Sequence, residues 1–76
     1  MHSFQDLLDN MPASIAELAR LAGVSERSII RARDGEAIQR STANKILRGL
    51  SQLYSQTFTL SNVAGFNLAS RDDRDD

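Results

Sequence analysis

The sequence contains no Cys, no Trp, one His and one Pro among its 76 residues. The absence of Cys excludes a disulfide framework and thiolate metal sites, and His2 has no second His with which to share a metal ion. The Ser residues lack a base that could activate a nucleophile, and the four Gly residues are scattered, with no phosphate-binding loop. The sequence therefore predicts neither an enzyme nor a protein that needs a metal or cofactor.

Long apolar runs are missing as well. No run approaches the roughly 20 residues that span a bilayer, and the N-terminus lacks the basic and apolar regions of a signal peptide. The hydrophobic share of 41% is nevertheless too high for a wholly disordered chain. We expect one small, soluble domain that binds no membrane and no small-molecule substrate.

Charge is close to balanced, at −1 overall, but it is unevenly distributed. Between Arg20 and Arg48 there are seven basic and three acidic residues, which gives a net charge of +4. The last seven residues, 70–76, hold two Arg and four Asp and are expected to be a disordered acidic tail. A basic middle is typical of a face that binds a polyanion, although a solvated helical surface has the same composition.

Capping signals divide the chain into four expected helices. Ser3 caps the first helix, which ends before Pro12, and Ser14 with Glu17 forms a capping box for a helix over Ile15–Ala22 that Gly23 ends. Ser25 caps a third helix over 26–34, and Ser41 is the expected cap of the longest, over 42–55. Gly49 lies inside that last helix, where it indicates close approach by another segment.

The segment after the fourth helix is expected to be short and irregular, with one helical turn over 61–65 and an extended stretch over 66–68. Its apolar side chains are too many to leave in water on a small domain. Either they fold back over the first and fourth helices, or they form a homodimer contact. These residues are Phe58, Leu60, Val63, Phe66 and Leu68.

Two short helices joined at Gly23 carry the signal of function. The stretch IAELARLAGVSERSIIR, from Ile15 to Arg31, has a small residue at Ala19, a glycine in the turn and apolar anchors on both sides. It resembles the helix-turn-helix of phage repressor and Cro proteins, the XRE-like or lambda-repressor-like type, and the resemblance extends over roughly residues 3–55. It implies an all-α domain of four to five helices over 1–69, with the helix-turn-helix at about 15–34.

Helical geometry indicates which side chains would contact base edges. Ser25, Ile29 and Ala32 cluster on the side of the third helix that packs inward, whereas Arg27 and Ile30 lie opposite. A recognition helix enters the major groove with its N-terminal part nearest the bases. The expected base-reading residues are Ser25, Glu26, Arg27, Ile30 and Arg31.

Four of these five assignments have an alternative. Arg27 and Arg31 form an ordinary solvated face if Glu26 is their partner. Ile30 suits a thymine methyl group, core packing or a dimer contact, and Glu26 accepts from cytosine, stabilises the helix dipole or orients an arginine. The resemblance implies base contacts at Glu26, Arg27 and Arg31, where many family members carry glutamines, so this chain should prefer a different target, richer in G·C.

Phosphate contacts are expected at the rims of the groove, where helix N-termini present free amides. The family often has a phosphate-gripping glutamine at the position of Ile15, a departure that shifts the expected contact to Ser14. The other expected phosphate contacts surround the start of the fourth helix. The complete set is Ser14, Gln39, Arg40, Ser41 and Lys45.

The function expected from these features is sequence-specific binding of double-stranded DNA by a transcriptional regulator. A repressor that occupies its operator in the cytosol or nucleoid of a prokaryote fits the resemblance best. The alternative is a protein-interaction module, or an antitoxin-like protein that binds a partner, on the same helical fold. Strong salt dependence of DNA binding would separate the two, because phosphate neutralisation is salt-dependent.

Overall fold

The structure, a computed structural model, describes residues 2–69. Within that range the chain forms four helices and four two-residue strands. In chain order they are β1 (His2–Ser3), α1 (Phe4–Asp9), α2 (Ile15–Ala22), α3 (Glu26–Arg33), β2 (Ala37–Ile38), α4 (Arg40–Tyr54), β3 (Val63–Ala64) and β4 (Asn67–Leu68).

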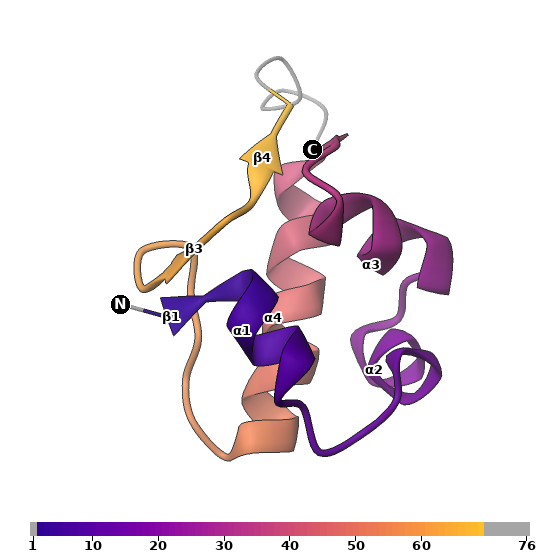
Figure 1. Cartoon of the computed structure of the whole chain (residues 1–76), viewed down its shortest axis with the longest axis vertical. Coiled ribbons are helices and arrows are strands. Elements are labelled where there is room, and N and C mark those ends of the chain that lie inside the picture. The colour runs from indigo at the N-terminus through magenta and orange to yellow at the C-terminus, as the bar shows by residue number, and fades with distance from the viewer. Residues whose placement is uncertain (1, 70–76) are drawn as a thin grey trace.

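Helix α4 is the central element. Figure 1 shows α2 and α3 on one side of it and β3 and β4 on the other. The largest fully buried side chains come from all four helices, because each helix turns one apolar stripe toward the same small core. These residues are Phe4, Leu18, Ile29, Ile46, Leu47 and Leu50. The expectation of a mostly helical domain is therefore confirmed.

The expected serine caps of the first three helices are present, although among the described residues only the Ser14 half of the expected capping box is formed, since no bond joins the Ser14 amide to the Glu17 carboxylate. The Ser14 hydroxyl accepts from the amide of Glu17 at 3.1 Å, and the Ser25 hydroxyl accepts from the amide of Ser28 at the same distance. Gly23 ends α2 in the left-handed conformation, with φ of 75°, which costs a glycine little. Helices α2 and α3 are therefore joined by only three residues, and their relative placement is tightly constrained.

The start of α4 differs from the expectation. Ser41 is not the cap: α4 begins at Arg40, and its N-cap is Gln39, whose side chain makes no capping hydrogen bond. The preceding residues are held in β2, so the extended backbone ends at Gln39, whose carbonyl accepts from the amide of Ala43 at 3.0 Å. Tertiary pairing thus overrides the local preference for serine at a cap.

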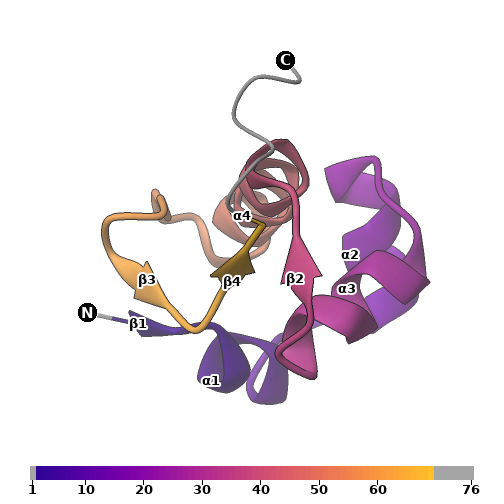
Figure 2. The same cartoon turned by 90° about the horizontal axis from the view of Figure 1, so that it is seen from above.

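The two small sheets make the all-α expectation wrong in detail. Strand β1 pairs in parallel with β3, and β2 pairs in parallel with β4, as Figure 2 shows from above. The expected helical turn over 61–65 is replaced in part by β3. Strands of two residues have no alternating pattern, so only the fold-back of the C-terminal segment creates them.

That fold-back is the arrangement the structure adopts. Phe58 and Val63 are buried in the core, and the Phe66 ring stacks on Phe4 with centroids 4.3 Å apart. Leu60, Phe66 and Leu68 are half-buried against the same core. The expected acidic tail, 70–76, lies outside the described residues.

Gly49 lies where α2 packs closely against α4. A Cβ atom placed on Gly49 would lie 2.9 Å from Cδ1 of Leu18 and 3.1 Å from Cβ of Ala22. The sequence indicated a close approach at this glycine but not its partner, which is now identified as α2.

Tyr54 gives the protein a predicted sensitivity to alkali. Its hydroxyl donates to the Leu7 carbonyl at 2.6 Å, and burial raises the pKa of Tyr54 above its ordinary value of 10.0. Folding therefore favours the neutral form of the Tyr54 phenol. The resulting contribution to the free energy of unfolding is fully present below the pKa of Tyr54 in the unfolded chain, and it is lost as pH rises through the higher pKa of Tyr54 in the folded protein.

We expect the free energy of unfolding to fall more steeply for the wild type than for Tyr54→Phe between about pH 9 and 12. Urea unfolding at several pH values measures this difference. Because Tyr54 is the only Tyr and there is no Trp, ultraviolet titration of the phenol reports on this one group. Equal pH dependence in the two proteins would contradict the prediction.

Candidate nucleic-acid interface

Helix α3 has one buried face and one exposed face. Ile29 and Ala32 are buried against the core, whereas Arg27, Ile30 and Arg31 are exposed. The expected division of this helix is confirmed, except that Ser25 is exposed rather than packed. Ile30 is 36% exposed and so is not a core residue, although it is large and apolar. The outward face therefore offers two guanidinium groups and one aliphatic side chain.

The N-terminal end of α3 is organised by serines. Ser25 caps the helix, and its hydroxyl also lies 3.1 Å from that of Ser28. Ser25 therefore has an established local role, whether or not it lies near a base. Glu26 is exposed in the first turn, where the helix dipole favours an acid, and no ion pair within residues 2–69 joins it to Arg27 or Arg31.

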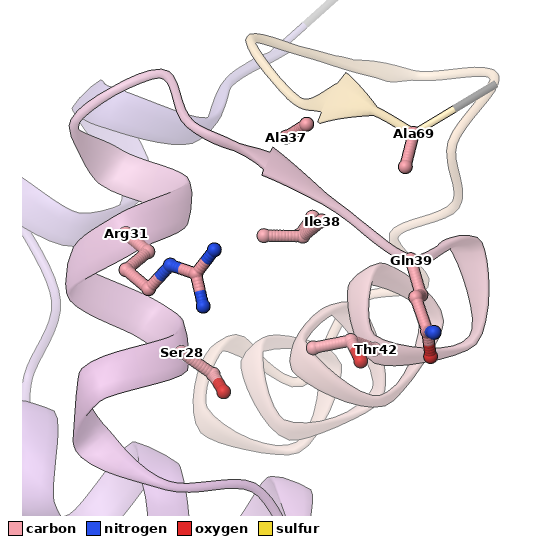
Figure 3. Close-up of a pocket in the computed structure, with 7 residues that line it drawn as sticks. All are labelled: Ser28, Arg31, Ala37, Ile38, Gln39, Thr42 and Ala69. Carbon is pink, nitrogen blue, oxygen red and sulfur yellow. The ribbon is translucent and has the colours of Figure 1, made fainter. Parts of the chain in front are cut away.

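A shallow hollow of about 320 Å³ lies between α3 and the start of α4. Figure 3 shows the Arg31 side chain extending from α3 into this space, with Ser28 beside it and Gln39 and Thr42 across from it. Strand β2 and Ala69 supply the rest of the lining. The fold thus places one expected base-reading residue, Arg31, and one expected phosphate-binding residue, Gln39, on opposite sides of the same hollow.

The basic side chains fall into two groups. Arg20, Arg31 and Arg33 each lie within 4.0 Å of a carboxylate, on Glu17, Glu36 and Asp34 respectively. The remaining cations of the basic segment have no carboxylate within that distance among residues 2–69 and are exposed. This second group consists of Arg27, Arg40, Lys45 and Arg48.

The start of α4 presents free backbone donors. The first turn of a helix leaves amides without intrahelical partners and carries a partial positive charge. Arg40, Ser41 and Lys45 are exposed around this turn, and no side chain caps it. By contrast, Ser14 begins a different helix, its hydroxyl accepts from the Glu17 amide, and it does not line the hollow.

Sequence reasoning missed Glu36, Ser28 and Thr42. Glu36 accepts a hydrogen bond from Nε of Arg31 at 3.0 Å, the role the sequence suggested for Glu26. A signal for it existed: a glycine just past a helix end brings the next residue back beside the last turn. Ser28 and Thr42 line the hollow only because α3 and α4 converge there, which their spacing along the chain does not indicate.

Comparisons with protein-family models, curated proteins and solved structures give no significant match to this chain. Among residues 2–69, no helix is both long and apolar enough to cross a membrane. The same range contains no cluster of three or more His, Cys, Asp or Glu side chains that could hold a metal ion. Assignment of a function therefore depends on the geometry around α3 and α4.

Proposed function

We propose that the protein is a sequence-specific double-stranded DNA-binding regulator of the phage repressor and Cro helix-turn-helix type. It would act in the prokaryotic cytosol, most simply as a repressor that occupies its operator. In this proposal α3 lies in the major groove and reads base edges, while the start of α4 contacts phosphates.

The observation that carries the proposal is the exposed face of α3. Arg27 and Arg31 are one helical turn apart on that face, and each guanidinium has the fork geometry that pairs with O6 and N7 of guanine. Ile30 lies between them, where an aliphatic side chain suits a thymine methyl group. A single exposed isoleucine is common on protein surfaces, so the two arginines, rather than Ile30, carry this argument.

Charge supports the same assignment. The cations without a carboxylate partner among the described residues lie on α3 and α4, not on α1 or the C-terminal segment. Uncompensated cations attract phosphates and release counterions on binding, which supplies most of the sequence-independent affinity. The overall charge of −1 is no obstacle, because local potential rather than net charge guides a polyanion to its site.

A homodimer on two half-sites would increase affinity and specificity, since one small module buries limited DNA surface. Phe58 and Val63 are occupied within the protomer's own core. The half-buried Leu60, Phe66 and Leu68, or the exposed Ile30, are the side chains through which two copies could meet.

A protein-interaction module, including an antitoxin-like partner, is the second candidate. The observation in its favour is that the two most exposed large apolar side chains, Leu21 and Ile30, lie on α2 and α3. Binding of a protein through these residues would depend little on salt, whereas binding of DNA depends on it strongly.

Salt dependence of duplex binding tests the proposal. With a fluorescently labelled pool of random duplexes, we expect log affinity to fall linearly with log salt, with a slope of about −0.9 for each phosphate neutralised. Contacts with about four phosphates correspond to a loss of about a hundredfold between 50 and 200 mM salt. Absent or salt-insensitive binding would favour the interaction module.

Two substitutions separate base reading from phosphate contact. On a duplex selected from a random library, Arg27→Ala is expected to weaken the free energy of DNA binding by about 1–3 kcal/mol and to reduce the sequence preference at one base pair. Lys45→Ala is expected to weaken binding to all duplex sequences alike and to reduce the slope of log affinity against log salt by about 1. Competition binding with single-base variants measures both, and identical behaviour of the two variants would contradict the assignment.

A further inference from the structure

Arg31 and Glu36 form a charge-assisted hydrogen bond beside the hollow. Nε of Arg31 donates to Oε1 of Glu36 at 3.0 Å, and the two side chains are 49% and 54% exposed. A pair this exposed adds little to stability. Its consequence lies instead in geometry, because it favours one direction of the guanidinium.

The backbone places Glu36 where it must be for this contact. Gly35, with φ of +87°, ends α3 in a Schellman arrangement: its amide donates to the Ala32 carbonyl at 3.2 Å, and the Glu36 amide donates to the Arg31 carbonyl at 2.9 Å. Glu36 is thus attached to Arg31 through both backbone and side chain. This arrangement requires a glycine at 35 but no particular residue at 36, so the carboxylate is a separate feature.

The C-terminal segment holds the same loop from the other side. Nδ2 of Asn67 donates to the Gly35 carbonyl at 3.0 Å, and β4 pairs with β2 immediately after Glu36. The carboxylate is therefore presented from a loop fixed at both ends, unlike a carboxylate on a free surface helix. A fixed acceptor reduces the number of orientations available to the long Arg31 side chain.

With Nε occupied, Arg31 retains its two terminal nitrogens as donors. Figure 3 shows these nitrogens pointing into the open hollow. Two parallel N–H groups from the end of a guanidinium match O6 and N7 of one guanine, and orienting them before binding lowers the entropy lost on contact.

We propose that Glu36 is a positioning residue that orients Arg31 to read a single guanine end-on. This inference depends on the proposed function, because it concerns how α3 discriminates among bases. It also predicts that the acidic residue aids specificity while opposing general affinity, since a carboxylate near the groove repels phosphate.

The test begins with selection of the full-length wild-type protein on a library of duplexes with about 16 randomised base pairs. Arg31→Ala, assayed on single-base variants of the selected duplex, identifies the base pair that Arg31 reads. Glu36→Ala and Glu36→Gln are then compared at that base pair. Both remove the same charge, but only glutamine keeps an oxygen that can accept from Nε, so the pair is matched for charge.

We expect the wild type to prefer guanine at that position by about tenfold or more. Glu36→Ala should reduce this preference at least about fivefold while binding random duplexes somewhat more tightly, and Glu36→Gln should retain most of the preference. Melting temperatures of the two variants should agree closely, because the backbone bonds of the loop do not use the side chain.

The outcomes distinguish the proposed DNA-binding function from the positioning role of Glu36. Failure of the wild type to enrich any sequence would overturn the proposed function, and this inference with it. Enrichment followed by an unchanged base preference in Glu36→Ala would overturn the positioning role alone. An equal change in both Glu36 variants at every position would also overturn it, because the carboxylate would then act only through its charge.

Discussion

Gly49→Val is expected to destabilise the protein by about 1–3 kcal/mol, mainly by forcing α2 away from α4. Even the first added carbon would lie 2.9 Å from Cδ1 of Leu18 and 3.3 Å from the backbone nitrogen of Ala22. Leu18 is fully buried, and the Ala22 nitrogen belongs to the helix itself, so neither can yield without a shift of α2. A chain of this size has a total stability of about 4–11 kcal/mol, so the loss is a large fraction.

Two further variants serve as comparisons for the loss of stability in Gly49→Val. Gly49→Ala gains about 1 kcal/mol of helix propensity but meets the same contacts, so a smaller net loss is expected. Gln52→Val places the same valine on the exposed face of α4 and should cost less than about 0.5 kcal/mol. Urea unfolding followed by circular dichroism measures all three. A Gly49→Val protein as stable as Gln52→Val would show that α2 and α4 are farther apart than described.

Phe4→Ala is expected to destabilise the protein by about 3–5 kcal/mol. The Phe4 side chain is 1% exposed, and its ring stacks on that of Phe66 with an interplanar angle of 26°. Its removal leaves a cavity in the core and withdraws the support on which the C-terminal segment rests. Because β4 and Asn67 hold the loop that carries Glu36, loss of this support should also reduce the preference for guanine at the base pair that Arg31 contacts.

The coupling of the two rings can be measured separately. In a double-mutant cycle with Phe66→Ala, we expect an interaction free energy of about 0.5–1.5 kcal/mol. Gln5→Ala, at an exposed neighbouring position on α1, serves as a control and should change stability by less than about 0.5 kcal/mol. Strict additivity of Phe4→Ala and Phe66→Ala would contradict the stacked arrangement.

Local chemistry made much of the fold predictable. Ser14, Gly23 and Ser25 each cap or terminate a helix end using atoms within a few residues, so their roles follow from spacing alone. The exposed face of α3 followed from helical periodicity for the same reason.

The parts that depend on distant segments were not predictable. Ser41 has the local character of a cap, but the pairing of β2 with β4, far apart in sequence, fixes Gln39 in that position. The hollow between α3 and α4 likewise has no signature in sequence spacing. Glu36 is intermediate: a glycine just past the end of a helix is a local signal for a loop that turns back, but only the side-chain geometry shows the hydrogen bond to Arg31.

The surface that contacts DNA can be mapped by nuclear magnetic resonance. Uniformly 15N-labelled protein is titrated with a duplex selected from the random library, at low salt where phosphate contacts are strongest. We predict that amide shifts change mainly over residues 25–31 and 39–45, with small changes in α1 and β3. Changes confined to α1 and the C-terminal segment, or none at all on addition of any duplex, would contradict recognition of DNA by α3.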